Sequence, residues 1–294
     1  MLRIDQVKDI KEAATLIFTL NNREAHHIAY CGEKEEEILN SLLNDFSDRD
    51  TKDSIVAAYE DGELIAVLGF DIDSERRTAE VWGPFVNTES GEKWLQIAQL
   101  LWTAGKELVQ EHVSTAYFFF NQHHQYMAAF MDTLGVERAG ENAIFHATQQ
   151  LCDELKVAHL PYLDPNQHEA FIALHEEAFP NSYYSGLDIL QRLNDHNKVL
   201  VSVGDNEQLQ GYIYVECEPE FGEGSIEFFA VAPSFQNQGI GTRLIQNGLF
   251  ELFGRQGIKK MNLCVDANDE KPIHVYKRAG LTVKHMLYFY KVQW

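Results

Sequence analysis

Residues 228–244 read FFAVAPSFQNQGIGTRL. The apolar run that stops at Pro233 predicts a strand, and the apolar positions after Gly241 fall at helical spacing. Gly239 and Gly241 therefore lie where a helix begins, and they have no side chains to cover its first N–H groups. Those donors, together with the positive end of the helix dipole, predict an anion site suited to a pyrophosphate.

Two well-known phosphate loops do not fit these letters. No Lys-Ser or Lys-Thr pair follows the second glycine, as a P-loop requires, and residues 239–244 lack the third glycine of the Rossmann fingerprint. An ordinary glycine turn remains the alternative, because a lone G-x-G occurs in many turns.

The segments around this stretch recur in the same order in the first half of the chain. A hairpin, a strand, an amphipathic helix, a strand, a second helix ending in glycine and a last strand are expected in each half. The first half also opens with a strand and helix over residues 2–20. The matching ranges are 54–70 with 198–215, 79–85 with 225–231, 94–110 with 241–255, 114–120 with 260–265, 121–135 with 268–280, and 142–148 with 286–292.

This repetition predicts an α/β fold of two tandem domains, each a twisted mixed sheet flanked by helices. The polar stretch 149–154 is the expected linker, which places one domain at residues 1–150 and the other at residues 151–294.

The second half resembles a known family. Val231-x-Pro233 followed by Gln236-x-x-Gly239-x-Gly241 is similar to the acetyl-CoA-binding motif of the GNAT superfamily of N-acetyltransferases. Residues 265–268 resemble the fifth strand of that family and its asparagine, and residues 275–281 resemble the helix whose tyrosine faces the thioester sulfur. The resemblance runs from about Val157 to the C-terminus, and a weaker form covers residues 1–150.

The resemblance implies acetyl-CoA as co-substrate and assigns roles to matching positions. Asn268 would hold the cofactor arm, and Tyr276 would be the general acid that protonates the departing thiolate. Apart from the family motif, Tyr276 also fits a tyrosine packed on a core-facing helix. The other expected cofactor-binding residues are Phe229, Ala230 and Val231 on the strand, and Gln236, Asn237, Gln238, Gly239, Ile240, Gly241 and Thr242 in the loop and helix start.

Glu227 is the candidate general base. It precedes Val231 by four residues, so a regular strand would place both on one face, about 13 Å apart, and a water would carry the proton. A solvated carboxylate at a strand edge is an equal alternative. Glu216, Glu218, Glu220 and Glu223 stand just upstream, where they could attract an ammonium group or simply form a wet surface.

The first half departs from this pattern. Residues 83–94 contain no Q-x-x-G-x-G and carry acids where phosphates would lie, and Met131 stands four residues before Gly135, where the second half has a tyrosine. Asn121 keeps an echo of the motif. The pairs at residues 26–27 and 123–124 are adjacent histidines without ligand partners at a metal-binding spacing. We therefore expect a degenerate, non-catalytic copy and no metal site.

Composition sets the remaining bounds. The chain has 294 residues, 45% of them hydrophobic, and a formal net charge of −21. Nucleic-acid binding is not expected from this charge, although residues 236–294 are net basic. The longest apolar runs are strand-sized and the N-terminus lacks a signal-like stretch, so we expect a cytoplasmic protein without a membrane partner. Four scattered cysteines are expected as buried reduced thiols: Cys31, Cys152, Cys217 and Cys264.

These observations favour an N-acetyltransferase whose C-terminal domain acetylates a primary amine of a small cationic molecule or a peptide. Within enzymes, a tandem acyltransferase similar to mycothiol synthase, acting on an amino-sugar conjugate, is an alternative. Outside enzymes, the alternatives are a CoA-binding sensor or interaction module without turnover and a purely structural α/β protein. The sequence carries no signal for the acceptor's identity or the oligomeric state.

Overall fold

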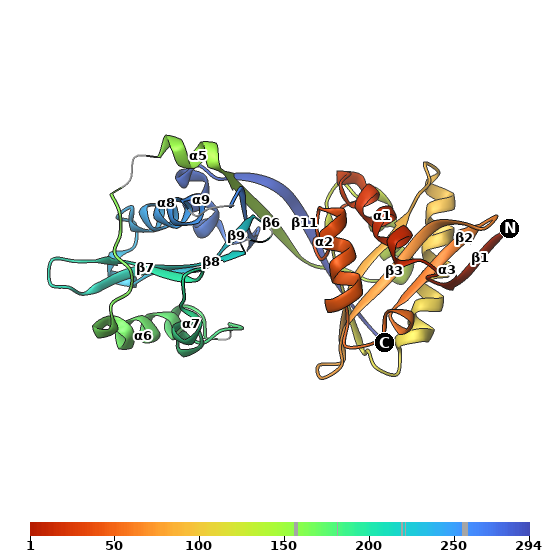
Figure 1. Ribbon diagram of the computed structural model, residues 1–294, viewed down its shortest axis with the longest axis horizontal. Coiled ribbons are helices and arrows are strands. Elements are labelled where there is room, and N and C mark those ends of the chain that lie inside the picture. The colour runs from red at the N-terminus through yellow and green to blue at the C-terminus, as the bar shows by residue number, and fades with distance from the viewer. Residues whose placement is uncertain (156–157, 181, 219, 221, 255–257) are drawn as a thin grey trace. The chain divides into compact units, whose positions relative to one another are not determined.

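The computed structural model describes residues 1–155, 158–180, 182–218, 220, 222–254 and 258–294, and it divides into two compact units (Figure 1). Unit 1 comprises residues 1–142 and 285–294, and unit 2 comprises residues 143–284. Each unit is a mixed sheet with packed helices, as the alternation of strand and helix patterns predicts.

Unit 1 has the strand order β1-β2-β3-β4-β5-β11. Its helix α3 packs on β2, β3 and β4, and the aromatic side chains of Trp94 and Phe130 are completely buried in its core. The elements are β1 (Leu2–Gln6), α1 (Ile10–Asn21), α2 (Glu35–Asn40), β2 (Ile55–Glu60), β3 (Glu63–Asp73), β4 (Thr78–Val86), α3 (Gly91–Val109), β5 (Thr115–Asn121) and α4 (Gln125–Leu134).

Unit 2 has the strand order β6-β10-β9-β8-β7. Helices α6 and α7 lie on one side of its sheet and α8 and α9 on the other (Figure 1). The elements of unit 2 are the larger part of β6 (Arg138–Thr148), α5 (Gln149–Glu154), α6 (His168–Ala178), α7 (Gly186–Arg192), β7 (Lys198–Val203), β8 (Leu209–Glu218), β9 (Glu223–Val231), α8 (Ile240–Phe253), β10 (Lys260–Asp266) and α9 (Glu270–Ala279). The last strand, β11 (Thr282–Gln293), lies mostly in unit 1.

The closing strands are exchanged between the two halves of the sequence. Strand β11 pairs antiparallel with β5 from Leu287↔Asn121 to Gln293↔Thr115, so the end of the chain completes the sheet of unit 1. Strand β6, from the first half, continues into unit 2 beside β10. The division therefore differs from the expected one between residues 150 and 151. Strand pairing joins residues far apart in sequence, and the local pattern of a strand does not name its partner.

The expected linker at residues 149–154 is a helix rather than an extended connection. In α5 the Cys152 thiol lies 3.9 Å from the carbonyl oxygen of Leu249, and Leu151 packs over Gly280. Both contacts tie α5 to the helices of unit 2, so this segment is part of the packed domain.

In each sheet a parallel pair of strands among the described residues opens into a gap. In unit 1, β4 pairs with β5 only from Thr78↔Thr115 to Glu80↔Tyr117. In unit 2, β9 pairs with β10 only from Glu223↔Lys260 to Ser225↔Asn262. All four strands continue beyond their paired residues, so the same feature occurs twice in the molecule.

The cysteines depart in one respect from the expectation of four buried thiols. Cys31, Cys152 and Cys217 are buried, but Cys264 is exposed. The described residues contain no disulfide. None of the described helices combines the length and apolar character that crossing a membrane requires.

Candidate functional site

Strand β9 turns alternate main-chain groups into the gap of unit 2. The Ala232 N–H donates to the Gln210 carbonyl on the β8 side, which makes these two residues a hydrogen-bonded antiparallel pair. Such pairs alternate along the ladder, so the N–H and C=O groups of Phe229 and Val231 point away from β8. The Gln236 amide confirms this direction, because it donates to the Val231 carbonyl at 3.2 Å. The gap is therefore lined by main-chain donors and acceptors of β9.

The loop after β9 leads to a helix start without a side-chain cap. Gly239 is the N-cap residue of α8, with φ of +79°, and a Cβ added there would meet nothing within 4 Å. Asn237 also has a positive φ, and the Gln238 amide donates to the Ser234 carbonyl at 3.3 Å. The loop thus folds on itself and leaves the N–H groups of the first turn of α8 without the usual side-chain acceptor.

Gly241 and Asn268, two further predicted site residues, lie near β9 and at the end of β10. A Cβ added at Gly241 would lie in ordinary contact with Val275 at 3.4 Å and with Val231 at 3.7 Å, so Gly241 lies against β9 and α9. Asn268 is exposed, and Asp266 accepts hydrogen bonds from both its main-chain and side-chain amides, at 2.8 and 3.0 Å. No described residue donates a hydrogen bond to the Asn268 side-chain oxygen.

Tyr276 lies on α9 among aromatic side chains. Its ring centroid is 5.5 Å from those of Phe229 and Phe145, and only 7% of the residue is exposed. Burial, and to a lesser extent the charge of Asp269, raise the pKa of the Tyr276 phenol. No described residue hydrogen-bonds to its hydroxyl. The phenol is therefore protonated at neutral pH.

Glu227 occupies a β-bulge, which corrects the expected placement of its side chain. Tyr214 pairs with Phe228 and Val215 with Ile226, so Glu227 has no partner on β8. Its carboxylate accepts a hydrogen bond from the Tyr183 hydroxyl in the connection between α6 and α7. Val231, by contrast, packs toward Gly241 of α8. The two side chains lie on opposite faces, because the extra residue of the bulge shifts the alternation.

The corresponding gap of unit 1 is filled by the chain itself. The Ala29 N–H donates to the Phe119 carbonyl at 2.8 Å, and the Asn121 N–H donates to the His27 carbonyl at 2.9 Å. An isolated bridge between Ile28 and Phe120 completes this pairing. The segment 27–29 thus lies along the free edge of β5 where that strand has parted from β4.

Two further differences separate unit 1 from unit 2. The main chain of Pro84 stands where that of Phe229 stands in unit 2, and proline has no N–H to donate. The loop before α3, residues 87–90, is half as long as the loop before α8, residues 232–239. The Ser90 hydroxyl accepts from the Lys93 N–H at 3.3 Å, which caps α3 with a side chain. The sequence signals for these features are Pro84, the short loop and the long connection before α2.

The repeat also pairs the asparagines differently from the sequence expectation. Asn121 ends β5 and accepts from the His123 N–H at 2.9 Å, just as Asp266 ends β10 and accepts from the Asn268 N–H. The counterpart of Asn268 in unit 1 is therefore His123, and Asn121 corresponds to Asp266.

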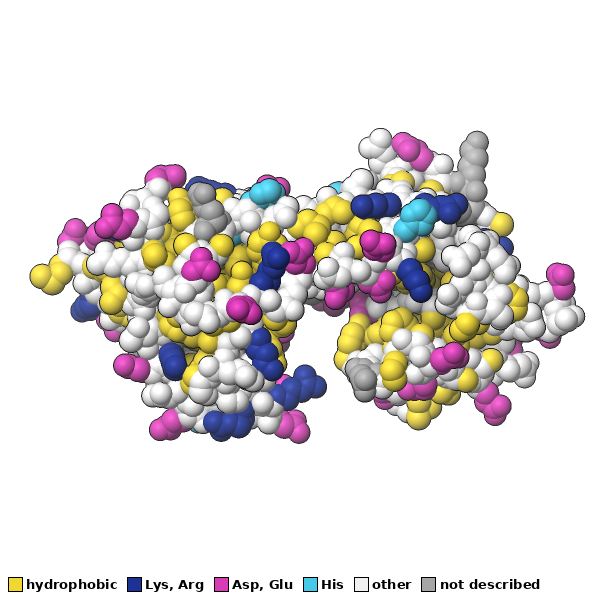
Figure 2. Space-filling model, turned by 180° about the vertical axis from the view of Figure 1, so that it is seen from behind, with side chains coloured by type: hydrophobic (Ala, Val, Ile, Leu, Met, Phe, Trp, Pro, Cys, Tyr) yellow, Lys and Arg dark blue, Asp and Glu magenta, His cyan; other side chains and the backbone are white. Residues whose placement is uncertain are grey.

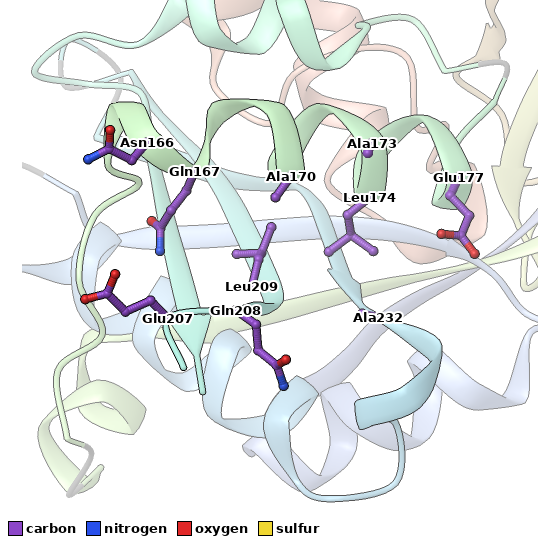
Figure 3. A pocket seen from close by; sticks show the side chains of 10 residues that line it. All are labelled: Asn166, Gln167, Ala170, Ala173, Leu174, Glu177, Glu207, Gln208, Leu209 and Ala232. Carbon is purple, nitrogen blue, oxygen red and sulfur yellow. The ribbon is translucent and has the colours of Figure 1, made fainter. Parts of the chain in front are cut away.

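A hollow in unit 2 lies under α6 and has a volume of about 450 Å³ (Figure 3). Ala170 and Leu174 of α6 and Leu209 of β8 form its apolar wall, and the carboxylates of Glu177 and Glu207 stand at its ends. None of the predicted site residues lines it, and no sequence motif indicates it.

Acidic and basic side chains are interspersed over the face of the molecule in Figure 2. Among the described residues, no group of three or more His, Cys, Asp or Glu side chains is arranged to hold a metal ion.

Comparisons with known proteins agree with this geometry. Residues 168–281 match the model of the acetyltransferase (GNAT) family. A mycothiol acetyltransferase from Propionibacterium freudenreichii subsp. shermanii is 25% identical over 118 residues, which cover 40% of this chain and only 38% of that relative.

Solved structures resemble the whole chain. A GCN5-related N-acetyltransferase from Sphaerobacter thermophilus has a TM-score of 0.72 at 17% identity, with 99% of this chain and 95% of that chain covered. A tandem GNAT protein from the clavulanic acid biosynthesis pathway has a TM-score of 0.65 at 14% identity and covers 100% of this chain and 98% of its own. The chain therefore has the fold of tandem GNAT proteins, and its residues 168–281 form a domain of the acetyltransferase (GNAT) family.

Proposed function

We propose that this chain is an N-acetyltransferase that transfers the acetyl group of acetyl-CoA to a primary amine, and that unit 2 alone is catalytic. The observation that carries the proposal is the gap between β9 and β10. The main-chain groups of Phe229 and Val231 face it, and it leads to a bare helix start at Gly239. Amide-bearing chains and pyrophosphates are the ligand chemistries that such a surface accepts.

The chain's residues fit acetyl-CoA as a co-substrate. The loop and first turn of α8 would bind the pyrophosphate through the N–H groups of residues 239–242. The outward-facing groups of β9 would hydrogen-bond the pantetheine amides, and the Asn268 carbonyl oxygen would accept from the same arm. Acetyl-CoA supplies the thioester carbonyl carbon that the amine attacks.

Two side chains would move the protons of the transfer. As the new C–N bond forms and the C–S bond breaks, Tyr276 would give its phenolic proton to the sulfur. Glu227 would receive the proton that the amine loses, either directly or through a water. The raised pKa of Tyr276 keeps this phenol protonated before each turnover.

The acceptor class rests on charge and on one relative. Glu227 offers a carboxylate for an ammonium group, which favours a cationic small molecule or a peptide amine. An amino-sugar conjugate is the second candidate, because the curated relative is a mycothiol acetyltransferase.

Release of CoA thiol, measured with acetyl-CoA and a panel of polyamines, arylalkylamines, amino sugars and peptides, tests the proposal. We expect thiol release with at least one amine and a mass increase of that amine by one acetyl group. Binding of acetyl-CoA without thiol release from any amine would instead favour the CoA-binding sensor. No thermal shift with acetyl-CoA would contradict both, because a ligand at a hundred times its Kd stabilises the fold by about 2.7 kcal/mol.

A further inference from the structure

Two carboxylates on the β8–β9 hairpin of unit 2 differ in how their charge is balanced. Glu216 accepts from Arg192 Nε at 3.1 Å and Nη2 at 3.0 Å, and also from the Tyr214 hydroxyl. A bidentate guanidinium neutralises this carboxylate. Glu227 accepts from the Tyr183 hydroxyl, and among the described residues no cation pairs with it. Of these two carboxylates, Glu227 is the one whose negative charge no cation among the described residues balances.

Aromatic rings surround that charge. The Tyr183 ring lies 5.0 Å from the ring of Phe228 and 4.7 Å from that of Tyr184, between centroids. The Arg192 guanidinium covers the Tyr184 ring at 4.2 Å, whereas Tyr183 is 64% exposed and keeps a face toward solvent. A carboxylate capped by an aromatic side chain that a ligand can reach is suited to an ammonium group with an apolar substituent.

A buried histidine holds the backbone that carries Tyr183. His175 is 0% exposed, and its Nε2 lies 2.9 Å from the Tyr184 carbonyl oxygen while its Nδ1 lies 2.6 Å from the Tyr212 hydroxyl. A carbonyl oxygen only accepts, so Nε2 carries the hydrogen and Nδ1 accepts from the phenol of Tyr212. Ser182 also lies within 3.2 Å of Nε2. His175 therefore ties the residues on both sides of Tyr183 to the central strand β8.

We propose that Tyr183 is a specificity-determining residue of the acceptor site and that His175 positions it. This inference rests on the proposed function. The Tyr183 phenol caps Glu227 until an ammonium group takes its place, and the ring then packs on the substituent of the amine. The substrate class is a primary amine with one positive charge and an apolar or aromatic substituent, rather than a polyamine, because Arg192 has already neutralised Glu216.

The test compares kcat/KM for phenethylamine, ethylamine and spermidine in the full chain. The wild type should prefer phenethylamine over both other amines by about tenfold or more. Tyr183→Ala should remove most of the preference over ethylamine, mainly through a higher KM for phenethylamine. Tyr183→Phe, which keeps the ring, should retain the preference within about twofold.

Positioning by His175 has its own readout. His175→Phe removes both hydrogen bonds and should raise the KM for phenethylamine by about tenfold with kcat and the Kd of acetyl-CoA nearly unchanged. His175→Gln supplies a donor for the Tyr184 carbonyl and should restore part of the loss. A wild-type KM for phenethylamine in a folded His175→Phe variant would overturn the positioning role. If His175→Phe unfolds, the His175→Gln variant carries the test: a KM between the wild-type value and that of Tyr183→Ala supports the role, and a wild-type preference in Tyr183→Ala overturns it.

The outcomes separate this inference from the proposed function. Thiol release with a preference for spermidine, or with the same preference in wild type and Tyr183→Ala, overturns the inference and leaves the acetyltransferase intact. Binding of acetyl-CoA without thiol release from any amine overturns the acetyltransferase and the inference with it.

Discussion

The gaps in the two sheets have the same strand arrangement, a parallel pair that stops pairing, but they differ in what fills them. In unit 1 the segment 27–29 hydrogen-bonds to the edge of β5, and Ser90 caps the adjacent helix. In unit 2 the pairing of β9 with β10 stops at Ser225 and Asn262, and the adjacent helix starts at a bare glycine. Loop lengths explain the contrast. The connection between α1 and α2 in unit 1, residues 22–34, is nearly twice as long as the connection between α6 and α7 in unit 2, residues 179–185. The loop before α3 in unit 1, by contrast, is shorter than the loop before α8 in unit 2.

This contrast teaches that a repeated fold can keep a ligand-binding site only where main-chain N–H and C=O groups lack hydrogen-bond partners within the chain. A buried N–H or C=O must find a partner. Unit 1 supplies partners from its own chain, and we infer that unit 2 takes them from acetyl-CoA.

The largest expected effect is that of Tyr276→Phe. Loss of the general acid should lower turnover about a hundredfold, while the Kd of acetyl-CoA stays within about twofold, because the phenol acts on the leaving sulfur. Steady-state kinetics and calorimetry measure the two quantities. The matched variant in unit 1, Met131→Leu, should turn over like wild type. Unchanged turnover in Tyr276→Phe would remove this residue from the mechanism.

A second variant gives α8 an acid in its first turn, as α3 has in Glu92. In Thr242→Asp the new carboxylate should weaken acetyl-CoA binding by about tenfold or more through repulsion of the pyrophosphate. The same charge favours the helix dipole by about 0.3–1 kcal/mol, so the melting temperature should not fall. Thr242→Val, of similar size and without charge, serves as the control. Equal affinities in both variants would place the pyrophosphate elsewhere.

A buried histidine in unit 1 predicts a dependence of stability on pH. Burial lowers the pKa of His124 to about 3, with further lowering from His26. Between pH 6.5 and about 3 the unfolded chain binds this proton and the folded chain does not. The contribution of His124 to the free energy of unfolding should therefore be complete above pH 6.5. It should be lost as the pH falls toward 3, by up to about 1.4 kcal/mol per pH unit. Denaturant titrations of wild type and His124→Asn should differ by this slope, and parallel profiles would contradict it.

The smallest effect is expected for the cap of α3. Ser90→Ala should lower the free energy of unfolding by about 1 kcal/mol, because the hydroxyl accepts a first-turn N–H. It should leave the affinity for acetyl-CoA unchanged, which denaturation and calorimetry can show together. A weaker affinity in Ser90→Ala would place part of the ligand site in unit 1.

The sequence predicts the local parts of this protein well and the non-local parts poorly. Strands, helices and the bare start of α8 follow from residue patterns within a few turns, and the structure confirms their order. The exchange of β6 and β11 could not be predicted, because a strand pattern does not specify which distant edge it joins. The contact of Tyr183 with Glu227 depends on a bulge that shifts a side chain to the other face. Pro84 and the long connection over residues 22–34 are the sequence features that indicate a filled gap in unit 1.

A crystal structure of the full chain with acetyl-CoA is the most direct measurement. We expect one molecule per chain, with its pantetheine between β9 and β10 and its pyrophosphate at the N–H groups of residues 239–242. The gap of unit 1 should still hold residues 27–29. Density for the ligand between β4 and β5, or an empty gap in unit 2 at saturating acetyl-CoA, would contradict the assignment of the site to unit 2.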